Sequence, residues 1–118
     1  MSDFSQAVLV ELSKWIDDSP AYVGIAPETA HWRRVSKVAA EAGEAIDALG
    51  GWVGENPRKG QTHTLADVLY ELLDVATAAL GAYEHLTGHK AGALGALDRH
   101  IVHVGTRAGL VTTPGGPR

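Results

Sequence analysis

The chain has 118 residues, of which 45% are hydrophobic and 20% are charged, a size and composition typical of one globular domain. Ten Lys and Arg residues against fourteen Asp and Glu residues give a formal net charge of -4, which excludes the broad basic surface expected of a nucleic-acid-binding protein. Cysteine is absent from the sequence, which excludes disulfides, thiolate metal sites, iron–sulfur clusters and cysteine nucleophiles.

No apolar stretch of the sequence reaches the roughly 18–20 residues that a membrane span requires. The N-terminal sequence MSDFSQAVLV carries an Asp and lacks the basic segment of a secretory signal peptide. We therefore expect a cytoplasmic protein whose partners include neither a membrane nor a nucleic-acid polymer.

Helical signals dominate the first half of the chain, and strand signals are thin. Apolar residues recur at helical spacing over about 4–18, and Ser19-Pro20 ends that helix. A second helix is expected to begin at Pro27, a favoured first-turn residue, and to run to about Leu49, where Gly50-Gly51 ends it.

Two further helices are expected in the second half of the chain. The segment 52–63 is polar and rich in Gly and Pro, which predicts a loop. Thr64 can cap a third helix, with Asp67 three residues further on, and this helix continues to about Leu86. A fourth helix is expected over about 91–108.

Four helices joined by short loops predict an all-α protein of the four-helix-bundle type. We expect residues 1–110 to form a single domain and residues 111–118 to form a flexible tail. Helical proteins of this size often bury their remaining apolar faces against a symmetric partner, so the bundle is expected to be completed by oligomerisation.

Two pairs of acidic residues stand out within the second and third expected helices. Glu41 and Glu44 are three residues apart, as are Glu71 and Asp74, and this spacing puts both carboxylates of a pair on one helix face. Like charges at such a distance repel unless a cation lies between them, and Mg²⁺ is the obvious candidate because it takes oxygen ligands. Each pair alone is also typical of a solvated helix face.

The surroundings of the two pairs favour a site over a solvated face. A solvated face would normally place Lys or Arg one turn after such acids, but these positions hold Ala45, Ala48, Val75 and Ala78. Carboxylates on otherwise apolar faces need a compensating partner. The sequence therefore predicts that the two helices present their acids to a shared divalent cation.

The motif Glu41-Ala-Gly-Glu44 followed by Glu71-Leu-Leu-Asp74 resembles the MazG-like nucleotide pyrophosphohydrolases of the all-α NTP pyrophosphatase group. Lys37, one turn before the first Glu, and the Gly before the second Glu are also similar to that family. The sequence ENPRKGQTHT and the later ELLDVATAAL resemble a MazG-like subgroup common in actinobacteria. The likeness covers about residues 30–86.

The resemblance implies a MazG-like bundle that works as a homodimer or homotetramer, with its site assembled by more than one subunit. It implies a Mg²⁺-dependent hydrolase, with Mn²⁺ as a substitute, that cleaves a nucleoside triphosphate between the α- and β-phosphates. The products would be a nucleoside monophosphate and pyrophosphate, and the role would be house-cleaning of the nucleotide pool.

On this interpretation the metal ligands are Glu41, Glu44, Glu71 and Asp74, and either Glu41 or Glu44 accepts the proton of the attacking water. The alternative second motif, Thr64-x-x-Asp67, lacks the Glu, which leaves Asp67 as a helper or an acid of the first helical turn.

Substrate-binding residues are expected on both sides of the first acidic pair. Lys37 would face the phosphates, although an ordinary surface lysine is an equal alternative. The loop residues Asn56, Arg58 and Lys59 have suitable chemistry to grip phosphate or sugar, although a solvated connector would contain them too. Trp32, with His31 as a hydrogen-bonding partner, is the best candidate for the base, although packing explains most Trp residues.

Four other interpretations stand beside this one. A diiron oxidase needs two Glu-x-x-His motifs, and Glu28-Thr-Ala-His31 is the only one in the sequence. His100, His103 and Arg107 share a helix face, for which a solvated face is favoured over a phosphate or metal site. A non-catalytic helical dimerisation or regulatory module, or an inactive member of the same family, satisfies the composition equally well.

Overall fold

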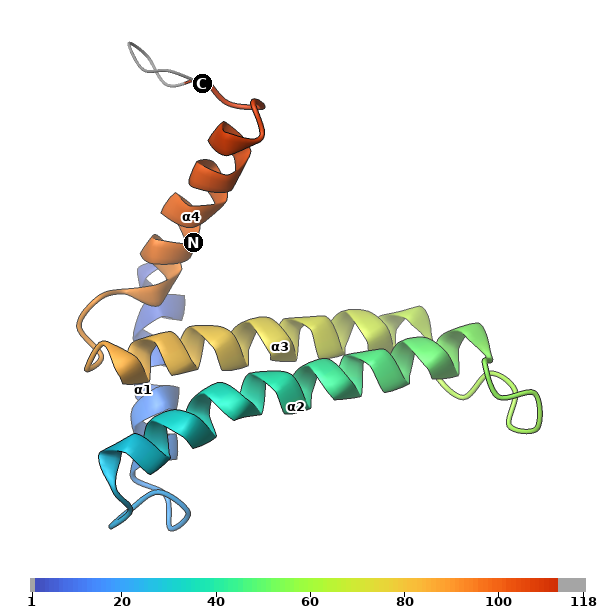
Figure 1. The fold of residues 1–118 in the computed structure, drawn as a ribbon, viewed down its shortest axis with the longest axis horizontal. Helices are drawn as coiled ribbons and strands as arrows, with labels where there is room; N and C mark the ends of the chain where they lie inside the picture. Colours follow the sequence, from blue (N-terminus) through green and yellow to red (C-terminus); the bar gives the residue numbers. More distant parts are fainter. Residues whose placement is uncertain (1, 113–118) are drawn as a thin grey trace.

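The structure of the protein is a computed structural model that describes residues 2–112. This part of the chain contains four helices and no strand (Figure 1), which confirms the all-α prediction. The helices are α1 (Asp3–Asp17), α2 (Pro27–Val53), α3 (Leu65–Leu86) and α4 (Ala93–Arg107). Most of the tail expected over 111–118 lies outside the described residues.

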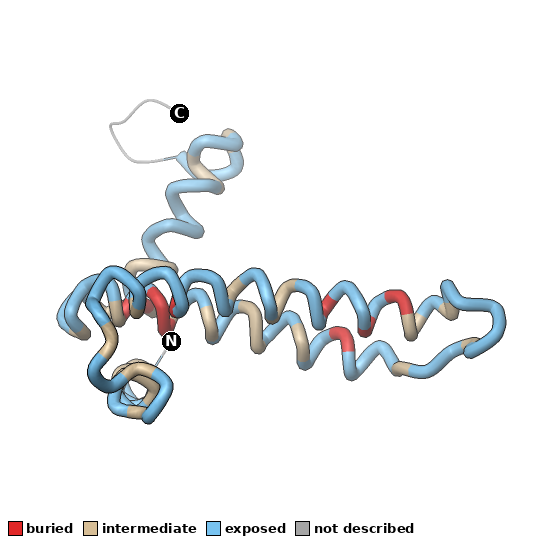
Figure 2. The backbone as a smooth tube through the Cα atoms, turned by 60° about the horizontal axis from the view of Figure 1, so that its bottom comes forward, coloured by how far each residue is buried: buried red, intermediate tan, exposed pale blue. Residues whose placement is uncertain are grey.

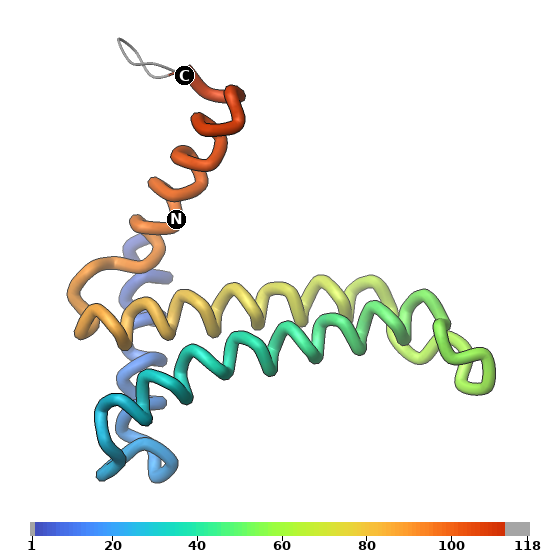
Figure 3. The backbone as a smooth tube through the Cα atoms, viewed as in Figure 1, coloured from blue at the N-terminus to red at the C-terminus, as the bar shows by residue number. Residues whose placement is uncertain are grey.

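Helices α2 and α3 lie side by side as a long antiparallel hairpin (Figure 3). The buried residues along this hairpin are mostly small, and they include Ala45, Ala48, Val68 and Ala82. Because alanine side chains are short, the two helix backbones can approach closely. The middle of α2, which carries the first acidic pair, therefore lies against α3, which carries the second.

Helix α1 crosses the end of the hairpin at which α2 begins and α3 ends (Figure 1). It buries Leu9 and Ser13 against that end. The Ser13 hydroxyl donates a 3.2 Å hydrogen bond to the carbonyl oxygen of Gly81 on α3. A buried serine with a backbone partner satisfies its polar atom while it holds α1 close to α3.

A buried arginine connects α1 to α2 at this crossing. The side chain of Arg34 is only 4% exposed, and it donates hydrogen bonds of 2.7 Å to Asp17 Oδ1 and 2.8 Å to Ser13 Oγ. His85 Nδ1 of α3 lies 2.9 Å from the same Asp17 carboxylate. Because a buried charge is tolerated only when it is paired and hydrogen-bonded, this network fixes three helices relative to one another.

Helix α4 is attached to the rest of the chain through a buried acid. Glu84 is 0% exposed, and its Oε2 accepts hydrogen bonds from Gln6 Nε2 at 2.8 Å and from the Ala93 backbone N–H at 2.5 Å. Gln6 Oε1 accepts a 3.0 Å bond from the backbone N–H of Leu94. The N-cap residue Gly92 has no side chain, so α3 and α1 together cap the start of α4.

Beyond this attachment, α4 points away from the hairpin (Figures 1 and 3). Figure 2 shows α4 mostly exposed, with some half-buried positions, and Ala93 is its only buried residue. The four helices of one chain therefore do not close into a compact bundle. Completion of the bundle by oligomerisation stays a prediction.

The observed helix ends agree with the expected capping residues and disagree at one pair of glycines. Pro27 is the first residue of α2, and Thr64 caps α3 in a capping box with Asp67, as predicted. The expectation that Gly50-Gly51 ends the second helix is wrong, because α2 continues to Val53 and ends at Gly54, which has a left-handed φ of 69°.

The loop after α2 approaches the helix closely at Gly50 and Gly51, which explains why these two positions are glycines. A Cβ on Gly51 would lie 2.0 Å from His63 Nδ1, and a Cβ on Gly50 would lie 2.7 Å from the Glu55 carboxylate. The glycines therefore make room for the loop that folds back on α2 instead of ending the helix. Among the residues that the structure describes, none of the helices combines the length and apolar character that a bilayer crossing requires.

Candidate metal centre

Three of the four predicted carboxylates converge where α2 and α3 pack together. Glu41 and Glu44 lie one turn apart on α2, and Glu71 reaches them from α3. Each offers a carboxylate oxygen, and these oxygens all lie within 4.8 Å of one another. The three-residue spacing of Glu41 and Glu44 is enough to put both on one face of α2. Their contact with Glu71 depends on the register in which α2 and α3 pack. The structure therefore brings together acids that are 30 residues apart in the sequence.

The donor set of this cluster fits a hard divalent cation. The side chain of Glu41 is only 14% exposed, and Glu71 Oε2 is buried without a hydrogen-bond partner in the described part of the chain. A buried carboxylate oxygen without a partner loses its hydrogen bonds to water and forms no other, which costs free energy. Mg²⁺ takes oxygen ligands, so it would supply the missing interaction at this oxygen.

The electrostatics of the cluster also show excess negative charge. Hydrogen bonding to Glu41 and the negative charges of Glu41 and Glu71 raise the pKa of Glu44, although Lys37 lowers it slightly. Lys37 Nζ lies 3.2 Å from Glu41 Oε1, and this contact raises the pKa of the lysine. One exposed ammonium group does not compensate three carboxylates, so the cluster is an unbalanced anionic centre.

The fourth predicted carboxylate, Asp74, lies in the wall of a cavity beside the cluster. This cavity has a volume of about 380 Å³, and Glu41, Lys37 and Asp74 line one part of it. A volume of this size is in the range of small-molecule sites. The structure thus places Asp74 at the cavity next to Glu41 and not among the three oxygens that meet.

The remaining wall of the cavity comes from residues that the sequence did not single out. Leu12 and Ile16 of α1, Tyr22 of the following loop, and the buried Arg34 all line it. Leu12 and Ile16 are four residues apart on an amphipathic helix, a signal that indicates a packed face but not what it packs against. Because α1 crosses the hairpin beside the acids, this face becomes the apolar side of the cavity.

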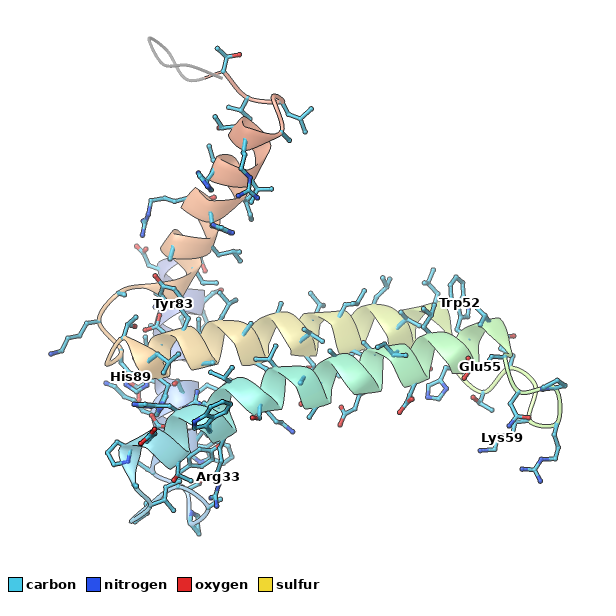
Figure 4. All side chains as sticks on the ribbon, in the orientation of Figure 1. Arg33, Trp52, Glu55, Lys59, Tyr83 and His89 are labelled. Carbon is cyan, nitrogen blue, oxygen red and sulfur yellow. The ribbon has the colours of Figure 1, made fainter. Side chains whose placement is uncertain are left out.

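The loop residues Asn56, Arg58 and Lys59 lie far from this centre within one chain. Figure 4 shows Lys59 and Glu55 at the tip of the hairpin, opposite the end that carries Arg33 and His89. Asn56 and Lys59 line a separate hollow at that tip, of about 220 Å³. The structure does not bring the predicted phosphate-gripping loop to the acids of the same chain.

Two other predicted substrate residues also lie outside the cavity wall. Trp32 is 71% exposed on the second turn of α2. His31 Nδ1 lies 2.8 Å from His85 Nε2, which connects it to the network around Asp17. Trp32 is free to contact a ligand or another chain, whereas His31 already has a polar partner.

Two groups of residues with alternative interpretations can be placed directly. Asp67 Oδ2 accepts a 2.9 Å hydrogen bond from the Thr64 backbone N–H, and this bond lowers the pKa of Asp67. Asp67 is therefore a helix-capping acid and not a member of the cluster. His100 and His103 lie on exposed turns of α4, with ring centres 5.8 Å apart.

No family model, no curated protein and no solved structure matches this chain. The likeness to MazG-like pyrophosphohydrolases therefore rests on the residues of the two acidic motifs and their neighbours. A function for the centre has to follow from its own chemistry.

Proposed function

We propose that the protein is a Mg²⁺-dependent nucleoside triphosphate pyrophosphohydrolase that converts a nucleoside triphosphate and water to a monophosphate and pyrophosphate. The observation that carries this proposal is the convergence of Glu41, Glu44 and Glu71 within 4.8 Å, beside a cavity of about 380 Å³. Carboxylate clusters of this kind suit Mg²⁺ or Mn²⁺, and Mg²⁺ in enzymes is commonly held by carboxylates together with the phosphates of a substrate.

The residues of the centre have different roles in the proposed phosphoryl transfer. When bound to these carboxylates, with Asp74 as a fourth ligand, the ion would neutralise charge on the triphosphate oxygens. Glu41 or Glu44 accepts a proton from a water molecule whose oxygen bonds to the α-phosphorus. The bond from that phosphorus to the bridging oxygen breaks, and pyrophosphate leaves. Lys37, in the wall of the same cavity, supplies a positive charge for the phosphates.

The apolar side of the cavity is suited to the nucleoside. Leu12 and Ile16 offer apolar surface and Tyr22 offers an aromatic ring, which a base and sugar can cover. Trp32, His31 and the loop residues Asn56, Arg58 and Lys59 do not line this cavity. A part for the distant loop residues in substrate binding would require a second chain, in keeping with a homodimer or homotetramer that acts on the nucleotide pool of the cytoplasm.

The proposal is tested by incubating the purified chain with Mg²⁺ and a panel of canonical and modified ribo- and deoxyribonucleoside triphosphates. We expect equal amounts of monophosphate and pyrophosphate from at least one member of the panel, and none in the presence of EDTA. Release of inorganic phosphate with a diphosphate would contradict cleavage at the α-phosphorus. A folded chain that turns over no nucleotide would support the non-catalytic helical module instead.

A further inference from the structure

Three histidines gather where α1 crosses the end of the hairpin. His31 lies near the start of α2, His85 lies in the last turn of α3, and His89 lies in the turn that follows α3. Figure 4 shows His89 at this end of the hairpin, opposite the loop at the tip. None of the three lines the cavity beside the acidic cluster. Because histidine is the side chain that changes its charge between about pH 5 and 8, protons should act on the molecule at this place.

The contact between His31 and His85 has room for one N–H group. His31 Nδ1 lies 2.8 Å from His85 Nε2, and the two rings meet edge to face. Two ring nitrogens at this distance share one hydrogen, which one of them donates to the lone pair of the other. If both nitrogens carried a hydrogen, two N–H groups would point at each other and the rings would separate. The pair can therefore hold one positive charge and keep its contact, but a second charge breaks it.

The surroundings assign the first positive charge to His85. Its Nδ1 lies 2.9 Å from the Asp17 carboxylate, and its side chain is only 9% exposed. An acceptor carboxylate and the last turn of a helix both favour a charged imidazole. His31 is exposed instead, and on its own helix the exposed Glu28 and Arg33, which have opposite charges, flank it. The second charge would thus fall on His31.

The charges around Asp17 give the second proton no new partner. The carboxylate already pairs with the Arg34 guanidinium at 2.7 Å. His89 Nε2 lies 3.6 Å from the same carboxylate and 2.8 Å from Ser13 Oγ. One negative charge therefore faces a permanent cation and two imidazoles. Once His85 is charged, each further proton adds positive charge that nothing in the described junction compensates.

We propose that His31 and His85 form an acid-sensitive contact, which holds the start of α2 to the end of α3 near neutral pH and opens when the second proton binds. The folded chain takes up that proton only when the contact is lost, so the unfolded chain binds it more readily. Stability should therefore fall as the pH falls through about 6.5, the ordinary pKa of histidine in an unfolded chain. Neither residue belongs to the acidic cluster or its cavity, so the proposal does not depend on the pyrophosphohydrolase activity.

Urea denaturation of the full chain at about pH 7.5 and about pH 5, without nucleotide or metal, tests the contact. His31→Gln keeps a polar partner for His85 but takes up no proton, so a charged His85 meets no second N–H. Between the two pH values, the unfolding constant should rise about 3- to 10-fold more for the wild type than for His31→Gln, which corresponds to one hydrogen bond.

His100→Gln is the matched control for this measurement. His100 is exposed on α4 and neighbours another histidine, His103, but their ring centres are 5.8 Å apart. This variant should keep the pH dependence of the wild type. The same pH dependence in all three proteins, or an equal reduction in both variants, would overturn the proposal.

Nitrogen NMR of the wild type gives a second measurement that needs no variant. We expect a coupling between His31 Nδ1 and His85 Nε2 across their hydrogen bond at neutral pH. At about pH 5 this coupling and the Overhauser contact between the two rings should weaken together as His31 becomes charged, while circular dichroism shows that the helices remain. Absence of the coupling at neutral pH, or a persistent ring contact when both imidazoles are charged, would contradict the proposal.

Discussion

Arg34 Nη1 on α2 lies 2.7 Å from Asp17 Oδ1 at the end of α1, and His85 approaches the same carboxylate from α3. Partial burial of Asp17 opposes its ionisation. Hydrogen bonds and charges from His85 and Arg34 outweigh the burial and hold the pKa of Asp17 below its usual value of 3.8. The ionised carboxylate therefore stabilises the junction of three helices that also forms one wall of the cavity.

The first prediction concerns this junction. Since the pKa of Asp17 is lower in the folded chain than in the unfolded chain, its stabilisation is present above about pH 3.8 and is lost as the pH falls through the folded value. Asp17→Asn should lower the free energy of unfolding at neutral pH by about 3 kcal/mol, because the buried Arg34 loses its counter-charge. It should also reduce the acid dependence of stability, as measured by urea denaturation over a pH series.

The neighbour Asp18 provides the control for that measurement. Asp18→Asn removes the same formal charge, and it should leave both the stability at neutral pH and the acid dependence close to wild type. If the two variants behave alike, the pair of Arg34 with Asp17 does not stabilise the junction.

The second prediction concerns catalysis. Glu41→Gln and Asp74→Asn should each lower pyrophosphate release by about 100-fold or more, because each removes a carboxylate from the centre or its cavity. Circular dichroism should show that both variants keep their helices. Glu11→Gln, which changes a carboxylate that is 76% exposed on α1, should release pyrophosphate at the wild-type rate. Strong residual activity in both site variants would move the chemistry elsewhere.

The third prediction concerns the unbalanced negative charge of the cluster. Mg²⁺ should raise the melting temperature of the wild type, because a ligand that binds only the folded state stabilises it. Glu71→Gln removes the charge at the unpartnered oxygen, and it should raise stability in EDTA by about 1 kcal/mol while the response to Mg²⁺ weakens. Differential scanning fluorimetry with and without Mg²⁺ measures both effects. If Mg²⁺ raises the melting temperature of Glu71→Gln as much as that of the wild type, the ion binds to other ligands.

The fourth prediction tests the loop at the tip of the hairpin. A Cβ on Gly51 would lie 2.0 Å from His63 Nδ1, so Gly51→Ala should displace the loop and cost about 1–3 kcal/mol. A Cβ on Gly43, also inside α2, would meet open space, with no neighbouring side chain within 4 Å. Gly43→Ala should therefore stabilise the chain by about 0.5–1 kcal/mol through helix propensity. Thermal unfolding of the two variants should show shifts of opposite sign, and a shared sign would contradict the fold of the loop.

The sequence is most informative where structure depends on neighbouring residues. The caps at Pro27 and Thr64 and the order of four helices follow from local backbone preferences, and the structure has them as predicted. The spacing of Glu41 and Glu44 likewise guarantees that these two side chains share one face of α2. The sequence near a glycine does not show whether the glycine ends a helix or makes room for a loop that packs against it. For this reason Gly50-Gly51 predicts the end of α2 too early.

Features that depend on distant contacts could not be read from the sequence. Nothing local distinguishes Arg33, which is exposed, from the buried Arg34 beside it, because the crossing of α1 selects one of the two. Glu84 is buried for a similar reason, since it meets α1 and the start of α4 together. The alignment of α2 against α3 decides which acids meet. It brings Glu71 to the acids of α2 and leaves Asp74 in the wall of the cavity.

The packing of Arg34 against Gly81 has an evolutionary consequence. A Cβ on Gly81 would lie 3.2 Å from Arg34 Nη2, so a methyl group at position 81 would require the guanidinium to move by a few tenths of an ångström. A homologue with a shorter side chain at position 34 has room for that methyl group, whereas a homologue that keeps the arginine must shift its buried guanidinium. Substitutions at the two positions should therefore be correlated among descendants of this chain.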